Sequence, residues 1–202
     1  MRLQNAAYTV RALQLVGELL AAEGHSIAIV ISGGAALNLL GIVDRTTTDV
    51  DILAFSISEG DAAPAPASLR EPPDPMPLVL QEAATTAGRS LGLGQGWLNT
   101  GPALQWRTGL PPELGERVSW QRFAGLWVGT VSRTDLIYFK LFAAADSSGT
   151  RSKHYQDLLA LKPTTDELMA AAEWVNIQDA SAPFADVLRQ VVSLVRAELS
   201  GG

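Results

Sequence analysis

The sequence of 202 residues contains no cysteine, no excess of basic residues and no long apolar run. The absence of cysteine excludes disulfide bonds, thiolate metal sites and a thiol nucleophile. A net charge of -6 is opposite to the basic excess that non-specific nucleic-acid binding requires, although a local basic patch could still bind RNA. No stretch approaches the roughly 20 apolar residues of a membrane span, and the N-terminus lacks a signal-peptide pattern. We therefore expect a cytoplasmic protein with no membrane partner.

Helical and strand patterns alternate along the first two thirds of the chain. Glycines end several of these patterns, as is typical of short elements joined by turns. Proline-rich residues 56–77 and residues 100–114 lack such a pattern and are expected to be loops. The expected helices are residues 5–23, 34–40 and 78–91, and the expected strands are residues 26–31, 49–55, 97–99, 118–123 and 126–131, the last two forming a hairpin.

From residue 134 onward the pattern is helical. Helices are expected at residues 134–145, 151–161, 164–175 and 182–199, separated by Gly149, Pro163 and Pro183. These patterns indicate an α/β front half, residues 1–132, and a helical C-terminal part, residues 133–202. We expect the two parts to pack as one compact unit.

The most informative segment joins a glycine pair to an aspartate pair. Gly33 and Gly34 follow an apolar strand and open a short helix, where backbone N–H groups can bind an anion such as phosphate. Asp49 and Asp51 lie in an expected strand, in which residues i and i+2 point to the same face. Adjacent carboxylates repel each other, and Mg²⁺, which prefers carboxylate and phosphate oxygens, relieves that repulsion.

Simpler explanations exist for each half of this segment. An Asp-x-Asp pair is most often a strand end that faces water, and a Gly-Gly turn after a strand suits many folds. The order of the two halves, with Arg45 between them, is more specific than either motif alone. Arg45 itself is either a clamp for phosphate or carboxylate, or a solvated loop residue paired with Asp44 or Asp49.

This motif order resembles the opening of the nucleotidyltransferase fold shared with DNA polymerase β. The matching residues are Gly33-Gly34-Ala35-Ala36-Leu37, then Arg45, then Thr47-Thr48-Asp49-Val50-Asp51. Within that fold the chain is most similar to the minimal group that includes the AbiEii-type toxins of toxin–antitoxin systems and related bacterial proteins. The resemblance covers roughly residues 10–160, because it continues through Trp97-Leu98-Asn99, the Lys140 region at 132–143 and the Asp157 region at 151–158.

The resemblance implies an α+β fold, in which a small mixed β-sheet is flanked by helices and a helical part follows. It implies an Mg²⁺-dependent nucleotidyltransferase that moves a nucleotidyl group from a nucleoside triphosphate to an RNA end, a protein or a small molecule. A cognate antitoxin is the implied protein partner. The implied metal ligands are Asp49 and Asp51, which share the catalytic role with Lys140 and Asp157, and the implied nucleotide-binding residues are Ser32, Gly33, Gly34, Arg45 and Thr48.

Lys140 and Asp157 also have explanations that need no substrate. A lysine on an otherwise apolar helix suits triphosphate oxygens, but it could equally extend from a solvated face near Asp135 or Asp146. Asp157 could complete an acidic cluster or act as a base, or it could be a surface residue near Lys153.

Two positions depart from the family pattern and support other functions. Asn99 stands where active members usually have a third carboxylate, and His154 stands where the toxin-like segment usually has an aspartate. The alternative function is therefore a catalytically degenerate nucleotidyltransferase fold that serves as a nucleotide-binding or protein-interaction module. A third possibility is a plain helical binding module whose aspartates only solvate a strand end.

Overall fold

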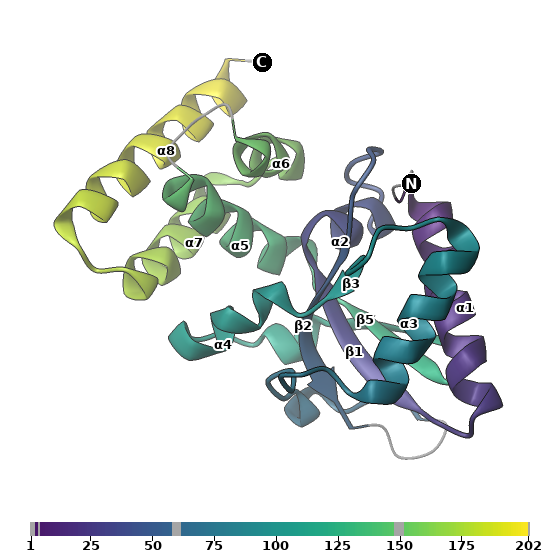
Figure 1. Ribbon diagram of the computed structural model, residues 1–202. Coiled ribbons are helices and arrows are strands. Elements are labelled where there is room, and N and C mark those ends of the chain that lie inside the picture. Colours follow the sequence, from purple (N-terminus) through teal and green to yellow (C-terminus); the bar gives the residue numbers. More distant parts are fainter. Residues whose placement is uncertain (1–2, 4, 58–61, 148–151, 202) are drawn as a thin grey trace. The chain divides into compact units, whose positions relative to one another are not determined.

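The computed structural model describes residue 3 and residues 5–57, 62–147 and 152–201 (Figure 1). By its internal contacts the chain divides into two compact units, Met1–Ser132 and Arg133–Gly202. The first unit holds the sheet and the second consists of helices. The fold is thus α+β, with a mixed sheet flanked by helices and a helical C-terminal part, as predicted.

The sheet of the first unit has five strands in the order β3-β2-β1-β5-β4. β1 is antiparallel to β2 and parallel to β5, and β2 is parallel to β3, which makes the sheet mixed. β4 and β5 form the predicted antiparallel hairpin. The bounds are β1 Ile27–Ser32, β2 Val50–Ser56, β3 Leu98–Asn99, β4 Ser119–Phe123 and β5 Leu126–Thr130.

β1 is the central strand, and its composition explains its place. Its sequence, Ile-Ala-Ile-Val-Ile-Ser, is mostly β-branched, and every residue after the first is buried. A strand that is covered on both faces requires such a continuous apolar run, because neither face meets water.

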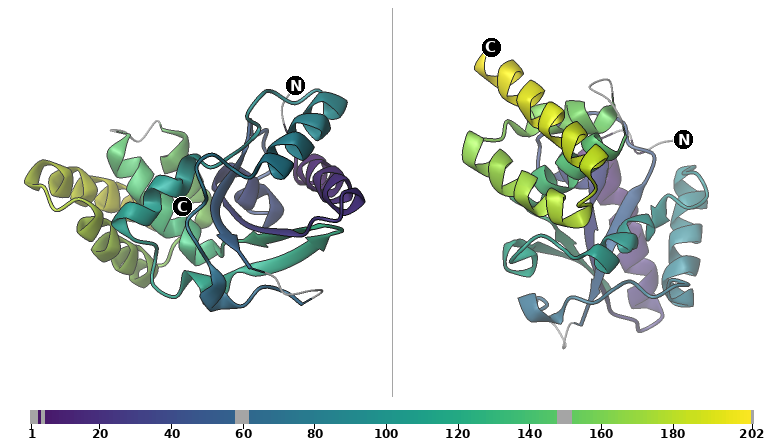
Figure 2. Two further views of the ribbon diagram at one scale, coloured as in Figure 1. Left: turned by 60° about the horizontal axis from the view of Figure 1, so that its bottom comes forward. Right: turned by 90° about the vertical axis from the view of Figure 1, so that its left-hand side faces the viewer.

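Two long helices of this unit lie side by side against the sheet, α1 Ala6–Ala22 and α3 Leu78–Leu91 (Figures 1 and 2). The Tyr8 hydroxyl of α1 donates a hydrogen bond to the carbonyl of Leu91 at the end of α3, over 2.6 Å. Gly17 lets α1 approach the hairpin closely, because a Cβ there would overlap the carbonyl of Phe123. The core between these helices and the sheet includes Leu13, Val16, Leu20, Ile29, Ile31, Ile52, Leu80, Ala84, Trp97 and Val128.

Short helical turns lie in the two segments expected to be loops and directly after the second of them. These are η1 Pro66–Ser68, η2 Gly101–Leu104, α4 Gln105–Thr108 and η3 Leu114–Arg117. Each has three or four residues, which is too short to show a helical repeat of apolar residues. Tertiary contacts hold them instead: the indole of Trp106 on α4 donates to the carbonyl of Leu53, over 2.7 Å.

The second unit contains the four predicted helices. They are α5 Arg133–Asp146, α6 Lys153–Leu161, α7 Thr165–Gln178 and α8 Ala182–Ser200. Thr164 and Glu167 form a capping box at the start of α7. Pro183 lies within the first turn of α8, where a missing N–H has no cost, rather than between helices as expected.

An aromatic cluster joins α5 to α7 inside this unit. The Trp174 ring meets Tyr138, Phe139 and Phe142 edge-on, with ring centroids 5.6, 6.0 and 6.3 Å apart. This arrangement places the positive edge of one ring against the negative face of another and adds to the burial of apolar area. Among the residues that the structure describes, no helix has both the length and the hydropathy to cross a membrane.

Candidate active site

The turn between β1 and α2 (Gly33–Leu39) forms one side of the candidate site. Gly33 has a φ of +70°, a backbone conformation that residues with a side chain rarely adopt. A Cβ at Gly33 would also overlap Oδ2 of Asp51. The turn therefore needs glycine for two reasons, and one of them is the approach of a carboxylate.

The pairing of β1 with β2 brings that carboxylate to the turn. Ser32 and Asp51 are opposite each other in the antiparallel ladder, so the residue after Ser32 lies beside the Asp51 side chain. Val50 and Ile52, on either side of Asp51, are fully buried. The predicted alternation is confirmed: the apolar neighbours anchor the strand in the core, while Asp51 is half-buried at the turn.

Asn99 of β3 lies on the other side of Asp51. The two residues are paired in the parallel β2–β3 ladder, and Nδ2 of Asn99 donates to Oδ1 of Asp51 over 3.3 Å. The Oδ1 atom of Asn99 accepts a hydrogen bond from the backbone N–H of Gly101, over 2.8 Å. These two bonds fix the amide so that its NH₂ group, rather than its oxygen, faces the carboxylate.

β2 begins at Val50, one residue later than predicted, so Asp49 lies just before the strand. The strand begins at Val50 because its N–H donates to the carbonyl of Trp97, over 2.6 Å. The Asp49 carbonyl instead accepts a bond from the Thr47 hydroxyl, over 3.3 Å. The same-face rule for strands therefore does not apply to Asp49, which is half-buried in the entry to β2.

Arg45 and Thr47 lie over the second glycine of the turn. A Cβ at Gly34 would be 2.9 Å from Oγ1 of Thr47 and 3.7 Å from Nη2 of Arg45. Nδ2 of Asn38, on α2, holds this segment by donating to the Arg45 carbonyl over 2.8 Å. The guanidinium of Arg45 is thereby held near the glycine turn.

Sequence reasoning missed Thr47 and Asn38. Thr47 is 2% exposed against the turn, whereas Thr48, the threonine expected to contact nucleotide, is exposed. Residues 46–48 are all threonine, so the sequence alone does not indicate which of them faces inward. Asn38 offered a weak signal, because a polar residue stands in an otherwise apolar short helix.

Ser32 is buried at the start of α2, but its side chain makes no capping hydrogen bond to that helix. Because α2 has only seven residues, its dipole adds little to anion binding. The Asp51 carboxylate against Gly33 would also repel an anion. Phosphate binding at this turn would thus depend on cationic partners, and the guanidinium of Arg45 lies nearby.

Lys140 and Asp157 form an ion pair inside the helical unit. Nζ of Lys140 on α5 lies 2.8 Å from Oδ2 of Asp157 on α6, and the two side chains are only 4% and 3% exposed. A solvated Lys140 and a surface Asp157 are therefore both excluded. Buried charges require such a partner, because desolvation of either one alone is costly.

Other members of the two later motifs have structural roles. Nε of Arg133 donates to the carbonyl of Leu161, and its Nη1 lies 2.5 Å from Oε1 of Glu167. This hydrogen-bonded guanidinium holds the pKa of Glu167 below its usual value. His154 is half-buried on α6, and Arg151 lies outside the described residues.

A cation held jointly by protein and substrate needs fewer protein ligands than an enclosed metal ion. Within the described ranges, no three or more His, Asp or Glu side chains gather closely enough to enclose a metal ion. Mg²⁺ does not need such an enclosure, since it is commonly held by one or two carboxylates together with waters and substrate phosphates. Asp49 and Asp51 are the residues that would hold it here.

The chain matches no protein-family model, no curated protein and no solved structure. The site is thus defined by its own geometry: a glycine turn, the Asp51 carboxylate against it, the Asn99 amide beside that carboxylate, and Arg45 nearby.

Proposed function

We propose that this chain is an Mg²⁺-dependent nucleotidyltransferase with a polymerase-β-type fold. One observation carries the proposal: the β1–β2 register places the Asp51 carboxylate against the Gly33 turn. Two motifs that are separate in the sequence thereby meet at one place. The arrangement puts a carboxylate, which is a cation ligand, next to a glycine turn, and a metal–nucleotide complex would bring both cation and phosphate to this place.

The reaction would transfer a nucleotidyl group to an acceptor hydroxyl. A bond forms between the acceptor oxygen and the α-phosphorus, and the hydroxyl proton is released to water. The bond between the α-phosphorus and the oxygen that bridges to the β-phosphate breaks, and pyrophosphate leaves with that electron pair. Bound Mg²⁺ would offset the negative charge of the phosphates. Asp49 and Asp51 hold the cation, and Arg45 together with backbone N–H groups of the Gly33-Gly34 turn binds phosphate oxygens. The hydroxyl groups of Ser32 and Thr48 donate hydrogen bonds to the nucleotide.

Lys140 and Asp157 have linked roles in this proposal. The ion pair between them commits the Asp157 carboxylate to a buried ammonium group. We therefore assign Asp157 to holding the Lys140 ammonium group in place. The acceptor is an RNA end, a protein or a small molecule. We place the reaction in the cytoplasm, and the protein partner of a toxin of this kind would be a cognate antitoxin.

Calorimetric titration of the protein with each of the four ribonucleoside triphosphates, with and without MgCl₂, tests the site. We expect Mg²⁺-dependent binding in the wild type and its loss in the double variant Asp49→Ala with Asp51→Ala. Asp44→Ala, which removes an exposed carboxylate from the same segment, is the matched control and should bind normally. Unchanged binding in the double variant would disprove this assignment.

A specific observation supports the second candidate, a nucleotide-binding or protein-interaction module without catalysis. The Asn99 amide takes the position beside Asp51 where a further carboxylate would add to the cation site. Incubation with each α-labelled triphosphate and Mg²⁺, alone and with total RNA, distinguishes the two functions. Label transferred to RNA or to the protein supports the transferase, and Mg²⁺-dependent binding without any transfer supports the module.

A further inference from the structure

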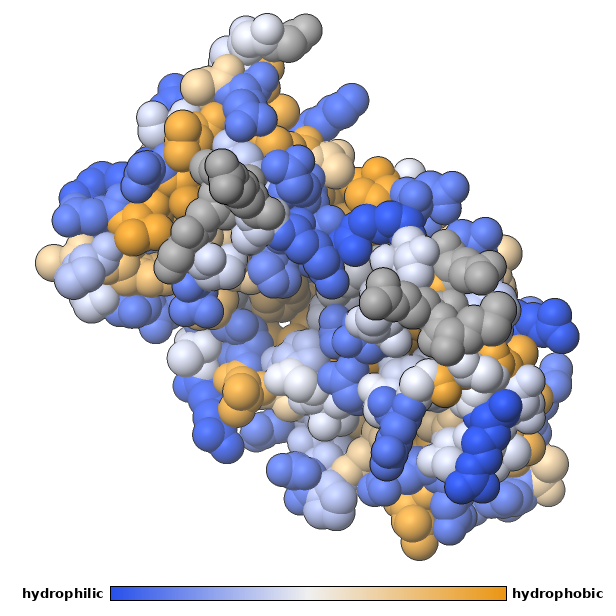
Figure 3. Space-filling model, turned by 45° about the horizontal axis from the view of Figure 1, so that its top comes forward, coloured by the Kyte–Doolittle hydropathy of each residue, from blue (hydrophilic) through white to orange (hydrophobic). Residues whose placement is uncertain are grey.

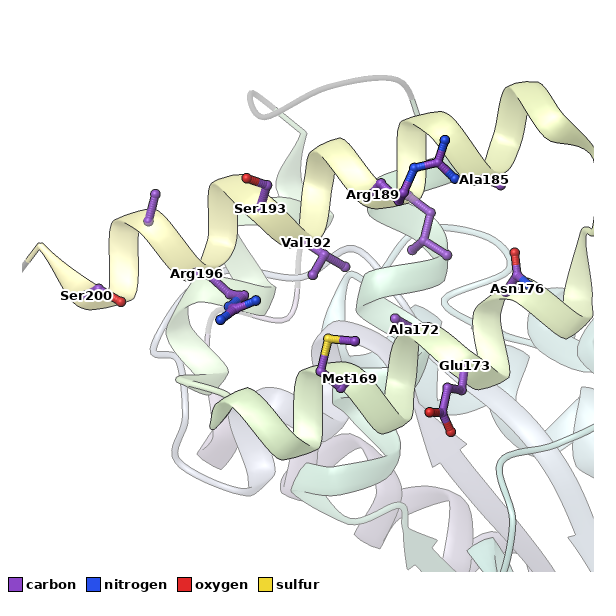
Figure 4. Close-up of a pocket in the computed structure, with 12 residues that line it drawn as sticks. Met169, Ala172, Glu173, Asn176, Ala185, Arg189, Val192, Ser193, Arg196 and Ser200 are labelled. Carbon is purple, nitrogen blue, oxygen red and sulfur yellow. The ribbon is translucent and has the colours of Figure 1, made fainter.

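The two last helices enclose a groove that the proposed function does not use. α7 and α8 run side by side in opposite directions, and the groove between them has a volume of about 740 Å³ (Figure 4). Its centre is apolar, with Met169 of α7 and Val192 of α8 pointing into the space between the helices. Met169 is 44% exposed, so its side chain is accessible from the groove. Most of the surface visible in Figure 3 is hydrophilic, and apolar residues lie on it in small patches.

The spacing of the lining residues suits another helix. On α7 they are Met169, Ala172, Glu173 and Asn176, the i, i+3, i+4, i+7 positions of one helix face. On α8 the same repeat runs from Ala185 to Ser200. Alanine and serine make up much of this lining, so the backbone of an incoming helix could approach closely. The shape therefore fits a helix better than a compact ligand.

The charges at the groove have opposite signs on its two helices. Glu173 lies on α7, and Arg189 and Arg196 lie on α8. Arg189 already pairs with Asp186. Glu173 and Arg196, in contrast, have no ion-pair partner among the residues that the structure describes. Glu173 and Arg196 are thus the charged residues at the groove with which a protein partner of opposite charge could pair.

We propose that the α7–α8 groove binds the same groove of a second copy of this chain. A twofold axis places residue i of one copy against residue j of the other, and j against i. Glu173 of each copy then meets Arg196 of its partner, and both unpaired charges are satisfied by one contact. Met169 and Val192 of the two copies form the apolar centre of a four-helix arrangement. A ligand with a single charge would satisfy only one of the two residues.

Sedimentation equilibrium of the full chain at micromolar concentrations tests this interface. We expect a mass of twice the chain for the wild type and of one chain for Val192→Asp. Ile177→Asp is the matched control, because Ile177 is 75% exposed on α7 but does not line the groove. This variant should stay dimeric. A monomeric wild type, or a Val192→Asp protein that remains dimeric, overturns the proposal.

Charge reversal separates the interface from an effect on folding. Glu173→Arg and Arg196→Glu should each weaken dimerisation at least tenfold, because each brings like charges together across the twofold axis. The double variant exchanges the charges and should restore it. Circular dichroism of all three proteins controls for loss of helix. If the double variant dimerises no better than the single ones, the pairing of Glu173 with Arg196 is wrong.

Discussion

At the scale of single residues, Gly33, Asp51 and Asn99 determine what the candidate site can do. Gly33 provides space for the Asp51 carboxylate, and Asn99 donates a hydrogen bond to it. The carboxylate is therefore held in place by its protein neighbours. Such preorganisation is what allows a binding site to form contacts without first ordering its own side chains.

Gly33→Ala should destabilise the fold by about 2–4 kcal/mol, because strain at positive φ adds to the overlap with Asp51. Gly41 is a matched control: its φ is +67°, and a Cβ there would have no atom within 4 Å. Gly41→Ala should cost only about 1 kcal/mol, from backbone strain alone. Urea denaturation measures both, and equal losses would contradict the crowding at Gly33.

Asn99→Asp should make the stability of the fold depend on divalent cations. The new carboxylate would lie beside Asp51, and their repulsion should cost on the order of 1 kcal/mol at neutral pH. Millimolar Mg²⁺ or Mn²⁺ should restore the loss by binding between them. Asn99→Ala, which removes the amide without adding charge, is the control. Thermal unfolding with and without the cation gives the result, and an equal Mg²⁺ response in the two variants would contradict the prediction.

At the scale of elements, buried and partly buried ion pairs fix the helices of the C-terminal unit. Lys140 and Asp157 join α5 to α6, while Arg133 joins the start of α5 to Glu167 of α7. The two pairs differ in exposure: the first is buried, whereas the Arg133 and Glu167 side chains are 39% and 28% exposed. The cost of desolvation therefore dominates the free energy of the first pair, whereas solvent screening weakens the attraction between the charges of the second.

Lys140→Met should destabilise the protein by about 3–5 kcal/mol, since it leaves the Asp157 carboxylate buried without its ammonium partner. Adding Asp157→Leu should recover most of this loss, because the second change removes the uncompensated charge. Lys153→Met, at an exposed position of α6, is the control and should have little effect. If the double variant is no more stable than Lys140→Met, charge burial is not the cause.

The Arg133–Glu167 pair should make a pH-dependent contribution. The bound guanidinium lowers the pKa of Glu167 in the folded state below its usual 4.5, so the stabilisation is present above pH 4.5 and is lost as pH falls through the lowered value. Glu167→Gln should cost about 1 kcal/mol at pH 7, a figure limited by the partial exposure of the pair, and nearly nothing at pH 2. Urea unfolding at both pH values checks this. Asp166→Asn, on the same turn, controls for the helix dipole.

At the scale of the whole molecule, the sheet-containing unit has a hydrophobic core of its own. All residues of its main core cluster lie between Leu3 and Val128, before the helical unit begins at Arg133. A unit that buries its apolar surface against itself can fold alone.

A fragment of residues 1–132 should therefore fold cooperatively. Its near-ultraviolet circular dichroism and urea unfolding should show a single sharp transition. A fragment of residues 1–117 is the control, because it lacks β4 and β5 and exposes an edge of β1. It should remain unfolded or aggregate. An unfolded 1–132 fragment would contradict the independence of this core.

The sequence was sufficient to predict most elements, because their periods and boundaries are local properties. β1 is a continuous apolar run, and α3 was predicted at its observed bounds because Gly92, with a φ of +66°, ends it. These signals extend over a few residues and need no knowledge of tertiary packing.

Side-chain partners across elements could not be predicted in the same way. The pairing of Lys140 with Asp157 depends on how α5 packs on α6, and no local pattern encodes that angle. The orientation of the Asn99 amide depends on Gly101 and on the β2–β3 register.

The Asn99–Asp51 contact has an evolutionary consequence. Asparagine and aspartate codons differ by a single base. The two side chains differ only in that an NH₂ group of asparagine replaces one carboxylate oxygen of aspartate. One point mutation would therefore convert the amide beside Asp51 into a carboxylate without altering the strand register. A single mutation would therefore add a cation ligand to this site, and the reverse mutation would remove it. Selection could act in either direction while the fold is kept.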